Sequence, residues 1–558
     1  MLNFAVMKKF VLILSVLLAG AGSVFAQKSK NHNFEINRNL EIFSDIYRQL
    51  DMYYVDTLDA DTVIGWAIQS MLRQVDPFTV YYSEDNMDEL KTMTTGKYAG
   101  IGAVVRFIKK EDRVAIDEPY EGTPAYKAGV KAGDVILTID GVDIKGMPVD
   151  KVTTMLKGTP GSSFVLEVRR YGVEKPLTFK IVRENIQLPS VPYYGMLPGN
   201  VGYIVLTGFT DNCSKDVRRA LVSLKEQGAR SLVLDLRGNG GGLLSEAVEI
   251  VNFFVPKGKK VVYTKGKVQS ANVEYTTRKE PLDTVMPMAV LVDRWSASAS
   301  EIVSGSLQDF DRALIVGTRT YGKGLVQTPR EVPYNGSLKV TTSRYYIPSG
   351  RCIQAYDYRH LNEDGSVGTV PDSLTRVFHT AAGREVRDGG GITPDVTITS
   401  NDTLPSMVVE LAVNDVVAEF GNWYVAQHDT IAPAASFDVA DEDYAQFVKM
   451  VKESGFTYNK RGRELLKLLT KTAETEGYTE EAREALNQLD TIFKGNLEAD
   501  MERNKKEVKL LLNDEIVRRY YYQKGGIELR IREDKDLKKA CSLLADEKAY
   551  KEKLNIKD

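Results

Sequence analysis

Short apolar runs alternate with amphipathic stretches through the middle of the chain. The runs at 231–236 and 288–293 are mainly apolar and partly β-branched, which is typical of buried strands. Small residues follow each run, and apolar positions then recur at helical spacing, to residue 254 in the first case and residue 310 in the second. We therefore predict two strand–loop–helix units whose loops meet in one layered core.

The two ends of the chain show helical patterns without strand-like runs. Between residues 34 and 75 the apolar spacing predicts two helices joined around residues 53–61. Beyond residue 405 the sequence becomes charged and mainly helical, with helices expected over 462–475 and 480–522. The apolar residues of this last part predict a small bundle core, and an oligomerisation or adaptor-binding role stays open. We expect the tyrosines at 520–522 to serve packing.

Residues 95–184 combine short strand patterns with turn residues at regular offsets. The segments YAGIGA at 98–103, GTPA at 122–125 and AGVKAGDVILTIDG at 128–141 resemble a PDZ domain. A PDZ domain binds an extended peptide along a sheet edge and holds its terminal carboxylate on backbone N–H groups. The resemblance assigns the carboxylate-binding loop to Gly100, Ile101, Gly102 and Ala103. A helix over about 148–156 would form one wall of the peptide-binding groove. An ordinary hairpin in a β-rich domain is the alternative.

A serine and a lysine in the core carry the candidate chemistry. Ser298 lies where the predicted strand turns into a helix, and the free N–H groups of a helix start stabilise nearby negative charge. A serine hydroxyl needs a base, and a lysine serves when burial lowers its pKa from about 10.4 toward neutrality. Lys323 lies between two glycines after an apolar run, and the amide oxygen of Gln327 could orient its ammonium. Alternatively, Ser298 is a plain helix cap and Lys323 a surface lysine.

Five ordered motifs favour the catalytic interpretation. They are DLRGNGGG at 235–242, SASASEIV at 296–303, GTRTYGKGLVQ at 317–327, YIPSGR at 346–351 and GGGITPD at 389–395. Together they resemble the carboxyl-terminal processing (tail-specific) proteases over roughly residues 35–400. The resemblance implies that Ser298 is the nucleophile, Lys323 the general base and Gln327 its orienting partner. One departure is Trp295, where the family usually has glycine, so the shape of the site entrance is left open.

Acyl transfer also needs N–H donors aimed at the developing oxyanion. Ala299, directly after the nucleophile, supplies one natural donor, and the glycine loop at 238–242 supplies the other through Gly240 or Gly241. Phosphate binding by this loop is disfavoured, because it lacks both the Gly-Lys-Ser/Thr ending of a P-loop and the third glycine of the dinucleotide fingerprint. Asp309, eleven residues after the serine, is expected to support the end of the helix.

Composition limits the partners. The 558 residues predict three or four domains, and the formal net charge of −3 without a long basic run argues against nucleic acid. Three cysteines and four histidines are scattered, so neither a disulfide framework nor a zinc pattern is expected. We expect no metal and no organic cofactor.

The N-terminus predicts export. Two lysines precede a short apolar stretch, and small residues lead to Val24, Phe25 and Ala26, which fits a secretory signal cleaved after Ala26. The apolar stretch is short for a spanning helix, although an uncleaved membrane anchor stays an alternative. The expected location is the periplasm or envelope of a bacterium.

These observations predict a multidomain α+β protein. Its core resembles the ClpP/crotonase-like βα fold, with an inserted PDZ domain, an N-terminal helical region and a C-terminal helical extension. The expected boundaries are 1–26 for the signal peptide, 27–94 for the N-terminal region, 95–184 for the PDZ domain, 185–404 for the core and 405–558 for the extension. A homodimer through the N-terminal region is one expectation for its assembly.

The predicted function is that of a serine endopeptidase that captures exposed C-terminal tails and cleaves near them. One alternative is a catalytically silent PDZ scaffold. Another is a protease dedicated to a single precursor.

Overall fold

The computed structural model describes residues 32–362, 364, 366–398, 404–458, 461–494 and 496–556. The predicted signal segment 1–26 lies outside this range. The chain separates into two compact units, the first ending at Tyr81 and the second beginning at Tyr82. The first unit contains the two predicted helices, 32–53 and α2 (Ala60–Arg73), and Asp59 caps α2 by accepting the Thr62 N–H. Within the described residues, no helix is both long and apolar enough to cross a membrane.

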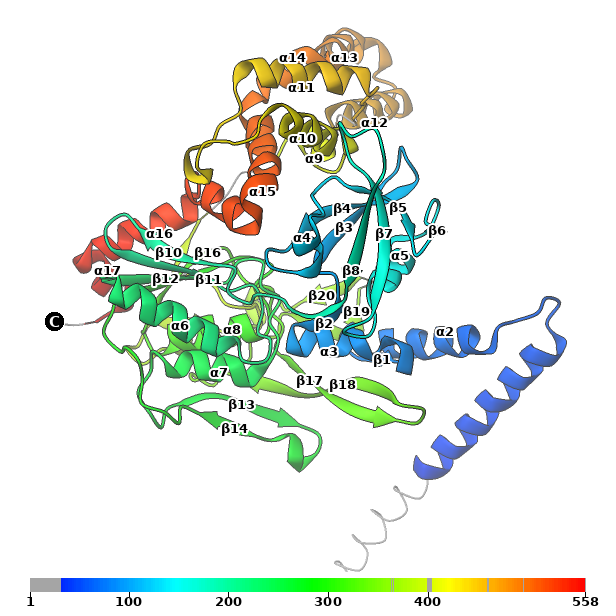
Figure 1. Ribbon diagram of the computed structural model, residues 1–558. Coiled ribbons are helices and arrows are strands. Elements are labelled where there is room, and N and C mark those ends of the chain that lie inside the picture. The colour runs from blue at the N-terminus through cyan, green and yellow to red at the C-terminus, as the bar shows by residue number, and fades with distance from the viewer. Residues whose placement is uncertain are drawn as a thin grey trace, which may run out of the picture. The chain divides into compact units, whose positions relative to one another are not determined.

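A six-stranded sheet forms the centre of the second unit (Figure 1). Its order is β10-β11-β12-β15-β16-β23, with β10 antiparallel and the others parallel. The strands are Tyr193–Leu197, Val201–Val205, Ser231–Asp235, Met288–Val292, Leu314–Gly317 and Val396–Thr397. The central strands are mainly apolar because both faces of the sheet are covered.

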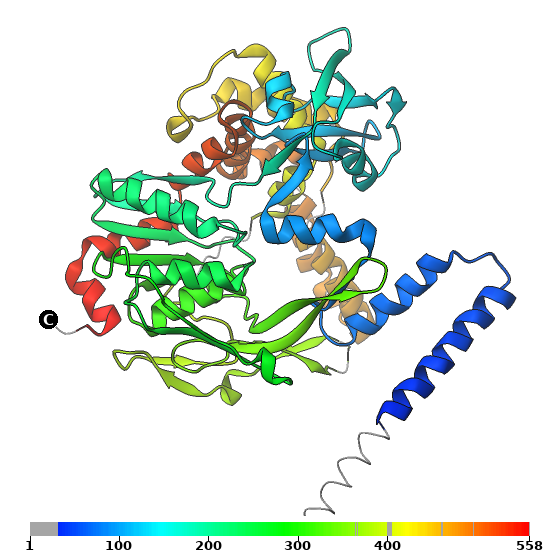
Figure 2. The ribbon, with the colours of Figure 1, turned by 60° about the horizontal axis from the view of Figure 1, so that its bottom comes forward.

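Different parts of the chain cover the two faces of this sheet (Figures 1 and 2). Helices α6 (Cys213–Glu226), α7 (Leu244–Asn252) and α8 (Ala299–Asp309) pack on one face, against side chains such as Leu234 and Val290. The alternate side chains, such as Val233 and Leu291, pack against α16 (Lys535–Ala545) and α17 (Glu547–Leu554). The last two helices of the C-terminal extension therefore complete the protease core.

A second, smaller sheet extends from the core. In it β18 (Gly336–Tyr346) pairs with β13 (Lys260–Gly266) and with β17 (Leu325–Val332), and β13 pairs with β14 (Glu274–Thr276). Two short hairpins follow in the chain, β19 (Tyr356–Leu361) with β20 (Val367–Thr369), and β21 (Val377–His379) with β22 (Glu385–Arg387). Strand β17 begins directly after the loop that carries Lys323.

The segment predicted as a PDZ domain folds into a separate sheet, β3-β4-β5-β7-β8, with β6 paired to β5. Its elements are β3 (Ala103–Ile108), β4 (Arg113–Pro119), α4 (Pro124–Ala128), β5 (Val135–Ile139), β6 (Val142–Asp143), α5 (Val149–Leu156), β7 (Ser163–Arg169) and β8 (Leu177–Val182). An antiparallel pair, β2 (Lys97–Gly100) with β9 (Glu184–Gln187), connects this domain to the core. Helix α3 (Met87–Thr95) leads into β2.

The extension begins with a helical bundle. Helices α9 (Ser406–Ala412), α10 (Asp415–Gln427), α11 (Asp441–Glu453), α14 (Leu497–Arg503) and α15 (Lys505–Ile531) share one apolar core, and α12 (Arg461–Glu476) and α13 (Thr479–Lys494) form a hairpin. The stretch predicted as helical over 480–522 is helical, but it is divided into α13, α14 and α15. Asn496 caps α14 by accepting the Ala499 N–H, and Asn504 leaves the helical conformation before α15.

The tyrosines at 520–522 pack as predicted. The Tyr520 and Tyr521 hydroxyls donate to backbone carbonyls of residues 428–432, and the ring of Tyr522 contacts Tyr126 of the PDZ domain edge-on.

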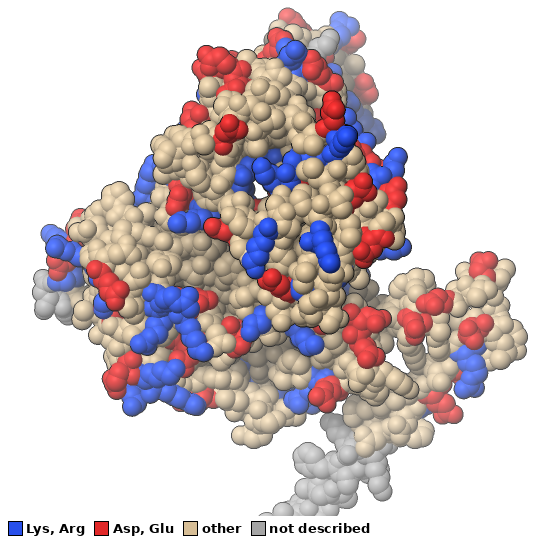
Figure 3. Space-filling model, viewed as in Figure 1, with Lys and Arg blue, Asp and Glu red and all other residues tan. Residues whose placement is uncertain are grey.

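Over the face shown in Figure 3, Lys and Arg side chains are interspersed with Asp and Glu.

Candidate active site

Ser298 is the cap residue at the start of α8 and has an unusual backbone conformation, with φ 57° and ψ −112°. A positive φ is uncommon for a residue with a side chain, and such strain costs on the order of 1–3 kcal/mol. Neighbouring groups hold it in place, since the Ser298 N–H donates to Glu301 Oε2 at 2.8 Å and the Tyr345 hydroxyl donates to the Ser298 carbonyl at 3.2 Å. The turn therefore presents the Ser298 side chain on the end of the helix.

The two neighbouring serines of the SASAS segment serve a different purpose. Ser296 and Ser300 are fully buried. The Ser296 hydroxyl donates to the Leu236 carbonyl at 2.8 Å, and the Ser300 hydroxyl donates to the Asn239 carbonyl at 2.8 Å. Only Ser298, of these three, lines a cavity.

That cavity has a volume of about 490 Å³ and brings together residues from distant parts of the sequence. Ser298, Lys323 and Gln327 all line it, as do the predicted oxyanion residues Ala299, Gly240 and Gly241. Most of the remaining wall is apolar and comes from Leu90, Met93, Leu243, Leu244, Ile302, Leu325, Val326 and Pro329. The cavity therefore offers an apolar site for a side chain beside the serine and lysine.

Lys323 lies half-buried on the loop between β16 and β17. Its backbone N–H donates to Glu301 Oε2 at 2.9 Å. Gln327, four residues later on β17, donates its amide N–H to the Thr341 hydroxyl at 3.1 Å. That bond fixes the amide and leaves its oxygen as the acceptor that this side chain can offer.

Glu301 joins the serine turn to the lysine loop. The side chain is fully buried and accepts four hydrogen bonds, two on each oxygen. Oε2 accepts from Ser298 N and Lys323 N, while Oε1 accepts from the Thr320 hydroxyl at 2.6 Å and from Gly322 N at 2.7 Å. Burial raises the pKa of Glu301 to about 7, although the four donors oppose the shift.

Glu301 was not among the predicted site residues. A glutamate three positions after a serine is the sequence signature of a capping box. This signal predicts the bond from Glu301 to the Ser298 N–H, but the partners at 320–323 become visible only in three dimensions.

The glycine loop contacts the turn that carries Ser298 directly. A Cβ on Gly241 would lie 2.8 Å from Ser298 Cβ and 2.9 Å from Ala299 N, and its φ of +100° also favours glycine. The Gly241 N–H donates to Asn239 Oδ1 at 2.9 Å. Among the described residues no acceptor takes the Gly240 N–H, so Gly240 is the better placed of the two predicted donors.

Asn239 links the two loops. Its carbonyl accepts the Ala297 N–H at 3.0 Å and the Ser300 hydroxyl, and its side-chain amide donates to the Leu206 carbonyl at 2.8 Å. This buried asparagine was not predicted either, because its role depends on contacts between two separate strand–loop–helix units.

Two other residues singled out in the sequence lie away from the cavity. Asp309 is buried at the far end of α8, where it pairs with Arg351 at 2.9 Å and accepts the Ser349 N–H at 2.9 Å. This position agrees with the predicted supporting role. Trp295 has 58% of its surface exposed and is not among the residues that line the cavity.

The predicted carboxylate-binding loop connects β2 to β3 in the PDZ domain. Gly100 is the last residue of β2 and Ala103 the first of β3. The Ile101 carbonyl accepts the Ala125 N–H, and the Gly102 carbonyl accepts the Tyr120 N–H. Gly102 has a φ of +74°, and a Cβ there would lie 2.3 Å from Thr123 Cβ, so the loop requires glycine at this position. Within the part of the chain that is described, no group of three or more His, Cys, Asp or Glu side chains could hold a metal ion.

The core has parallel strands and helices and carries a serine on a strained turn together with a lysine. A PDZ domain precedes this core in the chain. These features define the class of serine peptidases with an attached PDZ domain. The family model of Peptidase family S41 matches residues 200–374, and the model named "PDZ domain" matches residues 116–170. A third model, "Probable PDZ-protease, C-terminal helical domain", matches residues 407–544.

The similar proteins have related names. The chain is 36% identical over 352 residues to the "Carboxy-terminal-processing protease" of Bartonella bacilliformis, which covers 62% of this chain and 80% of that protein. It is 35% identical over 346 residues to the "Probable CtpA-like serine protease" of Staphylococcus aureus, covering 62% and 68%. The solved structure of the photosystem II D1 C-terminal processing protease is 28% identical, covers 64% of this chain and 92% of that chain, and has a TM-score of 0.35. The chain therefore belongs to the carboxy-terminal-processing protease family, within peptidase family S41, and is a peptidase.

Proposed function

We propose that this peptidase cleaves proteins near exposed C-terminal tails, with Ser298 as the nucleophile and Lys323 as the general base. The observation that carries the proposal is the shared cavity, which Ser298, Lys323, Gln327, Ala299 and Gly240 all line. No histidine is needed, because a neutral lysine amine in an apolar cavity can accept a serine proton.

In the proposed reaction, the neutral Lys323 amine takes the proton of the Ser298 hydroxyl while the oxygen attacks the peptide carbonyl. The electron pair of the carbonyl moves onto its oxygen, which accepts hydrogen bonds from the Ala299 and Gly240 N–H groups. When the tetrahedral intermediate collapses, the C–N bond breaks and the Lys323 ammonium gives its proton to the leaving amine. Water, deprotonated by Lys323, then hydrolyses the ester and restores Ser298.

Gln327 has an orienting role in this account. Its amide N–H is held by Thr341, so its oxygen is the atom that can accept a hydrogen bond from the Lys323 amine. Glu301 positions both Ser298 and Lys323, because one of its carboxylate oxygens accepts the backbone N–H groups of these two residues.

The PDZ domain supplies tail recognition. Strand β3 pairs with β4 on one side and ends the strand order of its sheet, and α5 contacts it. A substrate tail would add to the free edge of β3, with its carboxylate on the N–H groups of Ile101, Gly102 and Ala103. Many proteins end in an exposed tail, so this mode suits a set of substrates as well as a single precursor.

We infer further that the protein acts outside the cytoplasm of a bacterium. The predicted signal segment at 1–26 supports export, and the similar proteins named above from Bartonella and Staphylococcus are bacterial.

The test is cleavage of an unfolded protein with an apolar C-terminal tail by the mature chain, with products identified by mass. Ser298→Ala and Lys323→Ala should each abolish cleavage, while Gln327→Ala should leave a reduced rate. Blocking the tail with a C-terminal amide should slow cleavage without moving the cut positions. Equal activity in the serine and lysine variants would contradict the proposed dyad, and binding of the tail without cleavage by the wild type would favour the silent scaffold.

A further inference from the structure

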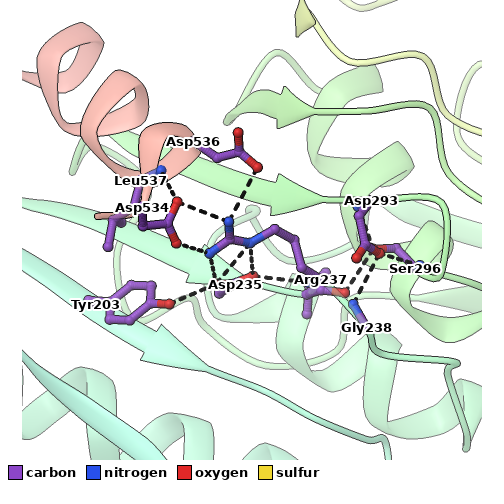
Figure 4. Close-up of polar contacts among 10 residues, drawn as sticks. Tyr203, Asp235, Arg237, Gly238, Asp293, Ser296, Asp534, Asp536 and Leu537 are labelled. Carbon is purple, nitrogen blue, oxygen red and sulfur yellow. Dashed lines mark hydrogen bonds and ion pairs between the residues drawn. The ribbon is translucent and has the colours of Figure 1, made fainter. Parts of the chain in front are cut away.

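The glycine loop is anchored to the C-terminal extension through an arginine (Figure 4). Arg237 lies between the end of β12 and Gly238, three residues before Gly240. Its guanidinium forms two ion pairs of short distance, one with Asp235 Oδ2 at 2.6 Å and one with Asp534 Oδ2 at 2.5 Å. The two carboxylates come from residues 299 positions apart in the sequence.

Asp534 makes two kinds of contact at once. Both of its oxygens accept from Arg237, with Nη1 at 3.0 Å from Oδ1 and Nη2 at 2.5 Å from Oδ2. Oδ1 also accepts the Leu537 N–H at 2.9 Å, so Asp534 is the N-cap of α16. The position of the helix and the position of the arginine are therefore fixed by the same carboxylate.

Asp235 holds the other side of the guanidinium. It is 5% exposed, accepts the Tyr203 hydroxyl at 2.7 Å and accepts the backbone N–H of Arg237 at 3.0 Å. Asp536 adds a longer contact to Arg237 at 3.2 Å. Burial alone would lower the pKa of Arg237, but the neighbouring carboxylates hold this pKa above its usual value. The arginine is therefore a permanent cation at this place.

Gly238, the residue after Arg237, attaches the glycine loop to the turn that leads to Ser298. The Gly238 N–H donates to Asp293 Oδ1 at 3.0 Å, and the same oxygen accepts the N–H groups of Trp295 and Ser296. The loop that carries Gly240 thus begins between two fixed points, the Arg237 cluster and the turn that leads to Ser298.

From this geometry we propose that Asp534 is a positioning residue for the oxyanion loop, so that the C-terminal extension completes the active site. By holding Arg237 against Asp235, Asp534 sets where the loop leaves β12 and hence where the Gly240 N–H lies. The inference rests on the proposed function of Ser298 and Gly240. Apolar contacts already attach α16 to the sheet, through Leu537, Ala540 and Leu544, and an additional bidentate ion pair at its first turn is not needed for docking alone.

The conservative variant Asp534→Asn separates positioning from stability. Asparagine caps a helix as well as aspartate does, so α16 should keep its start, while the charged bidentate pairing with Arg237 is lost. The matched control is Asp546→Asn, the same change at the N-cap of α17, where the carboxylate accepts the Ala549 N–H and is exposed. Arg237→Lys keeps the charge but removes the planar fork.

The full chain and its variants are compared by kcat and KM for a tail-bearing substrate, by the Kd of a tail peptide and by inhibition with a peptide boronic acid. The boronate forms a tetrahedral adduct with the serine and therefore reports the oxyanion site. We expect Asp534→Asn to lower kcat at least ten-fold and to weaken the boronate by a similar factor, with KM and the tail-peptide Kd within two-fold of wild type. Asp546→Asn should behave as wild type, and the effects of Asp534→Asn and Arg237→Lys should be less than additive, because both act through one contact.

Unchanged kcat and boronate affinity in Asp534→Asn would overturn the proposal. So would a deficit that disappears at temperatures well below the unfolding midpoint, because that result would mean that the ion pair only stabilises the fold. A Ser298→Ala variant is measured alongside. If that variant keeps its activity, the proposed function has failed, whereas loss of activity in Ser298→Ala with full activity in Asp534→Asn refutes only the role of Asp534.

Discussion

At the scale of single residues, the site depends on one buried carboxylate as much as on the dyad. Glu301 accepts the backbone N–H groups of Ser298 and Lys323 on one oxygen, and the Thr320 hydroxyl and the Gly322 N–H on the second. Both members of the proposed catalytic pair are therefore positioned through their main chains by the same side chain.

Glu301→Gln should lower kcat by about 10- to 100-fold, since small displacements of reacting groups cost rates of this order. All four partners of Glu301 are donors, and a glutamine has an NH₂ group at one end that must face two of them. Glu246→Gln is the control, because Glu246 accepts the N–H of Ser214 at 2.8 Å and does not line the cavity. Steady-state kinetics of both variants would check this, and equal rates in the two would contradict the positioning role.

The raised pKa of Glu301 makes a prediction about stability. Its ordinary value is 4.5 and its value in the fold is about 7, so between these limits the folded protein holds a proton that the unfolded chain has lost. The free energy of unfolding attributable to this group therefore falls as the pH rises from about 4.5 to 7. Urea denaturation at pH 5 and pH 8 should show that wild type, relative to Glu301→Gln, is more stable at pH 5 than at pH 8. The opposite trend, or a constant difference, would contradict the assigned pKa.

The sequence identified the candidate nucleophile, base and orienting residue better than the residues that support them. Ser298, Lys323 and Gln327 belong to short linear motifs, and the structure brings all three to one cavity. The supporting roles of Glu301 and Asn239 depend on partners from other loops, which no local pattern reveals.

At the scale of elements, the loop from Gly238 to Gly242 is shaped by its contact with the nucleophile turn. Gly241→Ala would place a Cβ 2.7 Å from the Ala297 carbonyl oxygen and 2.8 Å from Ser298 Cβ. We expect activity to fall by about 100-fold or more, because the loop must move away from the serine. Gly238→Ala is the matched control, since Gly238 also has a positive φ, of +70°, but its Cβ would meet no atom within 4 Å. Gly238→Ala should lower the free energy of unfolding by about 1–2 kcal/mol. Steady-state kinetics and urea denaturation of both variants measure the difference. Similar activity in the two variants would refute the importance of the contact between Gly241 and the Ser298 turn.

Helix boundaries show where local patterns stop being sufficient. The apolar spacing from 480 to 522 is compatible with one helix, yet the chain turns at Asn496 and Asn504 to pack α14 and α15 into the bundle. The strands at 231–235 and 288–292 were predicted closely, because burial on both faces makes them mainly apolar.

At the scale of the whole molecule, the C-terminal extension belongs to the protease core as well as to its own bundle. Its helices α10 and α15 contact the PDZ domain, through Asp415 to Arg106 and Arg518 to Glu118, while α16 and α17 cover one face of the central sheet. The apolar spacing predicted a small bundle core in this part of the chain. It did not predict the contacts with the sheet, because helical spacing shows that a face is apolar but not which partner covers it.

Leu544→Ala should destabilise the protein by about 2–5 kcal/mol, as expected when a buried leucine is truncated. Leu544 lies in α16 against the sheet and is 8% exposed, whereas Leu468 of α12 is 63% exposed and provides the control. Urea denaturation followed by the loss of peptidase activity would report unfolding of the core. If Leu544→Ala unfolds at the same urea concentration as Leu468→Ala, α16 does not stabilise the core.

Among the three closely spaced serines at 296, 298 and 300, Ser298 is the proposed nucleophile. The most direct test is to label the native protein with a fluorophosphonate, digest it and locate the adduct by mass spectrometry. We expect one adduct, on Ser298, because the hydroxyls of Ser296 and Ser300 are buried and bonded to backbone carbonyls. Labelling should be much slower in Lys323→Ala. An adduct on another serine, or labelling of Ser298 at an unchanged rate in Lys323→Ala, would contradict this proposal.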